Sequence, residues 1–320
     1  MLPPPPAASA PRRRGPLIAM VGALAVVVVV VAVSVAIGHR GHDRAAATAD
    51  TSSAAPTPAI TVSPVASPTV TAVASAPVTP SPSPSPVAPP GPRPPDNQPG
   101  PIILVPGFGG SDEMLAALAQ RLRNAGRTTI LLAIPNNATG DLRSQAALLG
   151  ARVAGELKAG APSVDLVGYS AGGLVVALFV ADHPQDVRRA VAIGAPFHGT
   201  NIAGLAAGLV PSMCPTACQQ MVPGSPLLPM LDAAQPARSG VPWMSMWTAH
   251  DQIVQPADSA RFAGADNIVL QNVCADDAVT HIDLPADPLV AGLTLKALGV
   301  AAMPSPSASD CSGLRSLGAG

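Results

Sequence analysis

The chain has 320 residues, a formal net charge of -1 and a charged fraction of 12%. This near-neutral composition, without a basic face in the globular part, excludes nucleic acid as an expected partner. All seven aromatic residues fall between positions 101 and 300. About 200 residues can bury a sufficient core without metals or disulfides, so we expect one globular domain at 101–300.

Residues 17–37 form an uncharged apolar run of 21 residues. At about 1.5 Å per helical residue this run spans roughly 31 Å, the thickness of the hydrocarbon core of a bilayer. Arg12, Arg13 and Arg14 precede it, which predicts a cytoplasmic tail at 1–16 and an extracellular domain. We therefore expect a single-pass anchor in the cell membrane. A signal peptide cut near residues 45–47, which would give a secreted protein, is the alternative.

The segment 38–100 is predicted to be a disordered linker rich in Pro, Ala, Ser and Thr. Residues 45–100 contain 15 prolines, three charges and no aromatic residue. Such a segment cannot bury enough apolar surface to fold. The Ser-, Pro- and Gly-rich residues 301–320 are expected to form a C-terminal tail.

Short apolar runs alternate with longer amphipathic runs along the domain. Predicted strands at 102–105, 129–133, 164–169, 189–193, 244–247 and 267–273 alternate with predicted helices at 112–124, 141–159, 172–182 and 287–298. This rhythm indicates an α/β fold with a mostly parallel sheet of about six strands and helices on both faces. Functional residues in such folds lie at the carboxyl ends of the strands.

The sequence Gly-Tyr-Ser-Ala-Gly at 168–172 stands between a predicted strand and a predicted helix. A serine on a strained strand-to-helix turn needs glycine two residues before and after it, because a Cβ there would collide with the backbone. Ser170 is therefore the candidate nucleophile.

An acid and a base are expected after later strands. Asp251 follows the strand that ends at Trp247, and His281 follows the last strand, which gives the chain order Ser, Asp, His. Other histidines and aspartates are alternatives for the base and the acid, although each also fits an ordinary position in a loop or at a helix end. They are His183, His198, His250, Asp232, Asp258, Asp276 and Asp277.

The loop after the first predicted strand reads Val-Pro-Gly-Phe-Gly-Gly at 105–110. Its glycines allow backbone N–H groups to approach a substrate oxygen. The N–H groups of Phe108 and Ala171 are the expected oxyanion-hole donors.

These motifs, together with Gly-Ala-Pro-Phe-His-Gly-Thr at 194–200, resemble small bacterial secreted or cell-surface lipases of the α/β-hydrolase fold. The resemblance covers residues 101–300 and implies hydrolysis of acylglycerols or related lipid esters by a monomer without a cofactor. Many lipases have His-Gly where this chain has Pro106-Gly107, which leaves the geometry of the oxyanion loop open. An acyltransferase with the same triad is one alternative, and a non-catalytic surface-binding module is another.

The four cysteines predict two disulfides in an oxidising compartment. We expect Cys214 to pair with Cys218 and Cys274 with Cys311, although three pairings are possible and a four-cysteine zinc site is an alternative.

Residues 201–237 are too long and apolar for a simple connection. We expect them either to line or cover an acyl pocket or to be helices that pack on the domain. Asp283 and Asp287 are placed like the calcium loop of some lipases, but two carboxylates do not make a six-oxygen shell, so no metal is expected.

Overall fold

The computed structural model describes residues 92–320, which belong to one compact unit, Val87–Gly320. The predicted cytoplasmic tail, the anchor at 17–37 and most of the linker at 38–100 lie outside the described residues. From residue 92 onward, no helix has the length and apolar composition needed to cross a bilayer. The described part therefore begins inside the predicted linker.

Six strands form one fully parallel sheet in the order β2-β1-β3-β4-β5-β6. They are β1 (Ile102–Val105), β2 (Thr129–Leu131), β3 (Val164–Tyr169), β4 (Val187–Ile193), β5 (Trp243–Trp247) and β6 (Asp266–Val269). The strand β2 lies on one side of β1, and the next strand in the chain, β3, lies on the other side. The direction in which strands are added therefore reverses at β1. Ligands of such sheets bind outside the carboxyl ends of the strands at this point. The parallel sheet confirms the predicted α/β fold.

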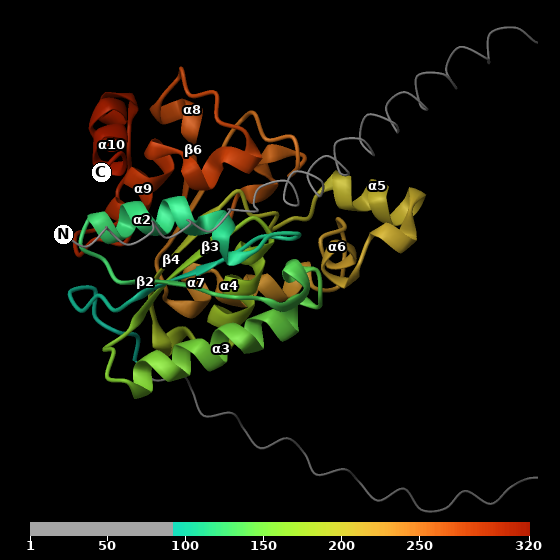
Figure 1. Cartoon of the computed structure of the whole chain (residues 1–320), viewed down its shortest axis with the longest axis horizontal. Coiled ribbons are helices and arrows are strands. Elements are labelled where there is room, and N and C mark those ends of the chain that lie inside the picture. Colours follow the sequence, from blue (N-terminus) through green and yellow to red (C-terminus); the bar gives the residue numbers. More distant parts are fainter. Residues whose placement is uncertain (1–91) are drawn as a thin grey trace, which may run out of the picture. The chain divides into compact units, whose positions relative to one another are not determined.

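Helices cover both faces of the sheet (Figure 1). Successive side chains of a strand point to opposite faces, so Ile103 and Val105 pack with α3 and α4, whereas Ile102 and Leu104 pack with α2 and α9. The helices are α2 (Ala116–Asn124), α3 (Leu142–Lys158), α4 (Ala171–Asp182), α5 (Asn201–Leu209), α6 (Thr216–Gln220), α7 (Pro236–Ser239), α8 (Leu270–Val273), α9 (Pro288–Ala297) and α10 (Cys311–Gly318).

Short 3-10 turns connect several of these elements. They are η1 (Asp112–Leu115), η2 (Pro135–Ala138), η3 (Pro184–Asp186), η4 (Pro211–Met213), η5 (Leu228–Ala234), η6 (Ala257–Ala260), η7 (His281–Ala286) and η8 (Ala308–Asp310). Aspartate side chains start two of the longer helices: Asp141 accepts from Arg143 N at α3, and Asp287 accepts from Val290 N at α9. These caps satisfy backbone donors that have no partner inside the helix.

Two segments form a different kind of element from the one that the sequence predicts. The strand predicted at 267–273 ends at Val269, and its last four residues form α8, since a short apolar run fits either element. The tail predicted at 301–320 ends in helix α10, which packs closely on α9. A Cβ on Gly292 of α9 would lie 2.1 Å from Leu314 O of α10, so glycine permits this approach.

Residues 92–100 are packed on the domain at the amino end of the sheet, although the sequence predicted them as linker. Arg93 donates to Arg188 O at 2.8 Å, and Arg188 donates to Asp96 O at 2.9 Å. Ser163 Oγ donates to Gln98 O at 2.8 Å. These hydrogen bonds hold residues 92–100 on the domain. Their partners lie far along the chain, so no local sequence pattern predicts them.

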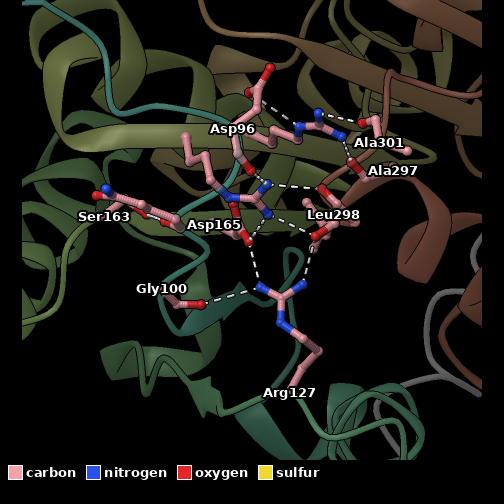
Figure 2. Close-up of polar contacts among 12 residues, drawn as sticks. Asp96, Gly100, Arg127, Ser163, Asp165, Ala297, Leu298 and Ala301 are labelled. Atoms are coloured by element: carbon pink, nitrogen blue, oxygen red, sulfur yellow. Dashed lines mark hydrogen bonds and ion pairs between the residues drawn. The ribbon is translucent and has the colours of Figure 1, made fainter.

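Buried charges connect this amino-terminal stretch to the end of α9 (Figure 2). Asp165 Oδ2 of β3 accepts from Arg188 at 2.5 Å and from Arg127 at 2.6 Å. Arg188 also donates to Leu298 O and Gly299 O, at 2.7 and 2.9 Å. Guanidinium groups thereby satisfy the last carbonyls of α9 and face the negative end of its dipole. Arg189 donates to Ala297 O, at the last residue of α9, at 2.9 Å. We call Asp165, Arg127, Arg188 and Arg189 the arginine cluster.

Candidate active site

Ser170 lies at the turn between β3 and α4 with φ 52° and ψ -126°. Positive φ is rare for a residue other than glycine, and such strain concentrates at functional sites. Neighbouring glycines make room for the turn. A Cβ on Gly168 would lie 2.5 Å from Gly172 O, and a Cβ on Gly172 would lie 2.3 Å from Val105 O. These are the two glycines that the sequence motif required.

A chain of hydrogen bonds joins Ser170, His281 and Asp251. His281 Nε2 lies 3.0 Å from Ser170 Oγ, and His281 Nδ1 lies 2.6 Å from Asp251 Oδ2. The carboxylate fixes the tautomer: Nδ1–H donates to Asp251, which leaves Nε2 to accept from the Ser170 hydroxyl. His281 and Asp251 are buried, whereas Ser170 is partly open to solvent.

Loops at the carboxyl ends of the strands hold the acid and the base. Asp251 follows β5, and its Oδ1 accepts from Ile253 N at 2.9 Å and from Val254 N at 2.8 Å. Thr248 Oγ1 donates to Val279 O at 2.7 Å, which joins the acid-bearing loop to the segment before His281. No local pattern predicts this partner, because Val279 lies 31 residues after Thr248 in the chain.

The loop after β1 approaches the serine closely. A Cβ on Gly107 would lie 2.8 Å from Ser170 Cβ, so only glycine fits there. Within residues 92–320, neither the Phe108 N–H nor the Ala171 N–H donates a hydrogen bond to another protein group. Ala171 is the first residue of α4, where the helix dipole favours negative charge. Neither predicted donor is therefore engaged by another protein group in the described part of the chain.

The rival acids and bases make other contacts. His183 stacks on Phe179 with ring centroids 5.0 Å apart, and His198 Nδ1 lies 3.1 Å from Ser259 O. His250 is exposed at a turn. Asp276 and Asp277 contact Arg315, Asp232 accepts from Gln235, and Asp258 lies in η6. In the described part of the chain, no hydrogen bond joins these rivals to Ser170.

The two carboxylates considered for calcium make local contacts. Asp283 accepts from Thr280 Oγ1 at 2.8 Å, and Asp287 caps α9. Both line an open pocket of about 350 Å³ with Asp276, Asp277 and Arg315. Burial raises the pKa of Asp287, and the contact with Arg315 lowers the pKa of Asp276. Residues before and after His281 line this pocket, which does not include Ser170.

The segment 201–237 contains α5, α6 and η5 and leaves apolar side chains at the surface. Leu205, Leu209 and Met213 are 47%, 58% and 56% exposed, respectively. A pocket of about 500 Å³ lies within this segment, between Ala207 and Pro226. In Figure 1, α5 and α6 lie beyond the end of the sheet rather than on its faces. Other apolar residues of the segment, among them Met221, Leu227 and Leu231, are buried in the core cluster that contains α4. The segment therefore contributes to the core and also presents apolar side chains at the surface.

All four cysteines are paired as the sequence predicted, in two disulfides, Cys214–Cys218 and Cys274–Cys311. No free cysteine remains among residues 92–320 for the zinc alternative. Disulfides persist in oxidising environments, so both bonds indicate an extracellular or secreted protein.

We predict that Cys311→Ser lowers the free energy of unfolding by roughly 3 to 4 kcal/mol, because the bond closes a separation of 37 residues. The same change should slow labelling of Ser170 by a fluorophosphonate, since Cys274 lies seven residues before His281. Thermal unfolding and labelling rates measure both effects. Cys214→Ser is the comparison: it should perturb the 201–237 segment more than global stability. Equal thermal shifts in the two variants would contradict this.

Known proteins resemble this chain in its fold. The family described as alpha/beta hydrolase fold matches residues 100–215, and no curated protein matches the sequence. Lipase B of Aspergillus fumigatus is similar with 21% identity and a TM-score of 0.53, covering 68% of this chain and 61% of its own. The mature lipase BlEst2 of Bacillus licheniformis is similar with 19% identity and a TM-score of 0.53, covering 67% and 96%. The chain thus spans about 61% of the length of the Aspergillus protein. The strand order, the matched segment and these structures together show that the chain has a lipase-like α/β-hydrolase fold.

Proposed function

We propose that the protein is an extracellular serine hydrolase that cleaves acylglycerols or related lipid esters. The observation that carries this proposal is the continuous chain of hydrogen bonds from Ser170 through His281 to Asp251. A buried carboxylate behind a histidine that accepts from a strained serine is the arrangement that acyl transfer to serine requires. A surface-binding module would need neither the strain nor the buried acid.

The reaction follows from these positions. His281 Nε2 takes the proton of Ser170 as Oγ attacks the ester carbonyl carbon, and Asp251 stabilises the resulting imidazolium. The N–H groups of Phe108 and Ala171 donate to the oxyanion of the tetrahedral intermediate. His281 then gives the proton to the leaving alcohol as the ester C–O bond breaks. Water attacks the acyl-enzyme by the same route in reverse and releases the carboxylic acid.

Two features support lipid esters and hydrolysis. Apolar side chains are exposed both in the 201–237 segment and at Ile282, directly after His281. A surface of this kind suits substrates with acyl chains. Ser170 is partly open to solvent, which allows water to reach the acyl-enzyme. An acyltransferase would instead have to exclude water at this stage.

The two disulfides support a location outside the cytoplasm. We extend this to a membrane-anchored protein whose catalytic domain is extracellular, on the basis of the uncharged run at 17–37. The mass of the mature amino terminus tests the anchor. A mature chain that starts near Thr48 would show cleavage and a secreted enzyme instead.

Hydrolysis of p-nitrophenyl esters of increasing acyl length by the full-length chain tests the reaction. We expect release of p-nitrophenol and free acid without any added acceptor. Release that depends on an added alcohol, with an ester as product, would identify an acyltransferase. No release with any chain length, together with no fluorophosphonate labelling, would favour a binding module.

A further inference from the structure

Tyr169 is the only tyrosine in the chain and stands directly before Ser170, at the end of β3. Its side chain is buried and points to the face of the sheet that α2 and α9 cover. The serine motif itself requires glycine at its two flanks and sets no demand on this position. The identity of the residue there therefore needs its own explanation.

The Tyr169 hydroxyl donates to the backbone carbonyl of His281 at 2.9 Å. The phenol and imidazole rings also pack together, with centroids 5.3 Å apart and planes tilted by 33°. Burial, followed by the charge of Asp251, raises the pKa of the phenol, so it stays protonated and remains a donor. One side chain thus contacts both the main chain and the ring of the histidine.

His281 needs such support because no strand carries it. It begins the short turn η7, twelve residues after β6 ends at Val269. Its imidazole contacts Ser170 and Asp251, but these bonds act at the far end of the side chain. Tyr169 adds a contact to the backbone of His281. The next residue, Ser170, is itself held on β4, because its N–H donates to Ile193 O.

A core position would not by itself select tyrosine. A buried hydroxyl loses hydration and is tolerated only when it forms a hydrogen bond, whereas phenylalanine fills nearly the same volume without this cost. The hydroxyl of Tyr169 therefore has a specific task at the His281 carbonyl.

We propose that Tyr169 is a positioning residue that holds the main chain of His281 at a fixed place relative to Ser170. The strand that presents the nucleophile then also sets the location of the base. The inference rests on the proposed function, because it assigns a role within the same Ser170–His281–Asp251 arrangement. Proton transfer between Ser170 and His281 depends on their separation, so the effect of this contact lies in the chemical step.

Tyr169→Phe in the full-length chain tests the proposal, because it removes one oxygen atom and keeps the ring. We expect kcat for p-nitrophenyl esters to fall by roughly 2- to 10-fold, the effect of one hydrogen bond, while KM stays unchanged. Fluorophosphonate labelling should slow by a similar factor and still reach completion. The downfield proton resonance of the His281 Nδ1–H should exchange faster with water, because the imidazole is less firmly placed.

Ser163→Ala is the matched control. Ser163 directly precedes the same strand, and its buried hydroxyl donates to Gln98 O at the amino end of the sheet. This variant loses a hydrogen bond of the same kind and should keep the wild-type kcat and proton exchange. Equal kcat values for Tyr169→Phe and wild type would overturn the proposal, as would an equal loss of kcat in both variants.

Replacement of tyrosine by 3-fluorotyrosine during expression gives a second test, since it changes only this position in the chain. The modified residue keeps its hydroxyl, so we expect kcat and the exchange rate of the downfield proton to match the wild type. A loss like that of Tyr169→Phe would assign the effect to ring packing and contradict the positioning role. Wild-type protein that neither hydrolyses esters nor reacts with fluorophosphonate would instead contradict the proposed function.

Discussion

Ser170→Ala should abolish labelling by a fluorophosphonate and reduce kcat for ester hydrolysis by about 10³- to 10⁶-fold. Within residues 92–320, the hydroxyl of Ser170 is the only one that forms a hydrogen bond with His281 Nε2, at 3.0 Å. Its backbone strain, with φ 52°, presents this hydroxyl at the carboxyl end of the sheet. Without the hydroxyl no acyl-enzyme forms, and only the slower direct attack of water remains. Mass spectrometry of the labelled protein and a stopped assay measure the two effects.

Ser245→Ala is the control for this prediction. Ser245 is a buried serine of β5 that donates to Ala260 O, away from His281. Its loss should reduce stability and leave labelling complete. Labelling that persists in Ser170→Ala at the wild-type rate would contradict the assignment of the nucleophile and point to another reactive group.

The candidate site was predictable to the extent that it depends on local rules. Gly168 and Gly172 are required by the backbone of the turn, so the motif identifies Ser170 without knowledge of the rest of the fold. Asp251 and His281 were predicted from chain order, because a parallel sheet brings the carboxyl ends of its strands to one edge. The hydrogen bonds that join these residues agree with that order, while their catalytic roles stay a prediction.

Contacts between distant residues could not be predicted in the same way. Tyr169 and His281 are 112 residues apart, and a tyrosine in an apolar run is equally consistent with ordinary core. Likewise, the strand predicted to begin at Arg189 begins at Val187 and includes Arg188, which is buried although arginine usually lies at the surface. Helix α10 contains glycine and serine, which are poor helix formers, and forms where Leu314 packs on α9 and Cys311 is bonded to Cys274. In each case a partner far along the chain overrides the local preference.

Arg188→Leu should lower the free energy of unfolding by about 3–5 kcal/mol, the usual effect of removing one partner from a buried ion pair. Arg188 is fully buried and donates to Asp165, Leu298 O, Gly299 O and Asp96 O. Burial already raises the pKa of Asp165, because lost hydration outweighs its two guanidinium contacts. Without Arg188, this carboxylate and the end of α9 lose a main donor. For a domain of this size the melting temperature should fall by roughly 6 to 20 °C.

Arg152→Leu provides the comparison for Arg188→Leu. Arg152 pairs with Glu156 on the surface of α3, and such exposed pairs contribute well below about 1 kcal/mol. A similar fall in melting temperature for both variants would contradict the importance of burial.

The position of Arg188 adds a second expectation. It lies at the amino end of β4, whereas Ser170 lies beyond the carboxyl end of β3. The fraction of Arg188→Leu that remains folded, counted by fluorophosphonate labelling, should therefore keep the wild-type kcat. A lower kcat per labelled serine would show that the arginine cluster also shapes the site at the opposite end of the sheet.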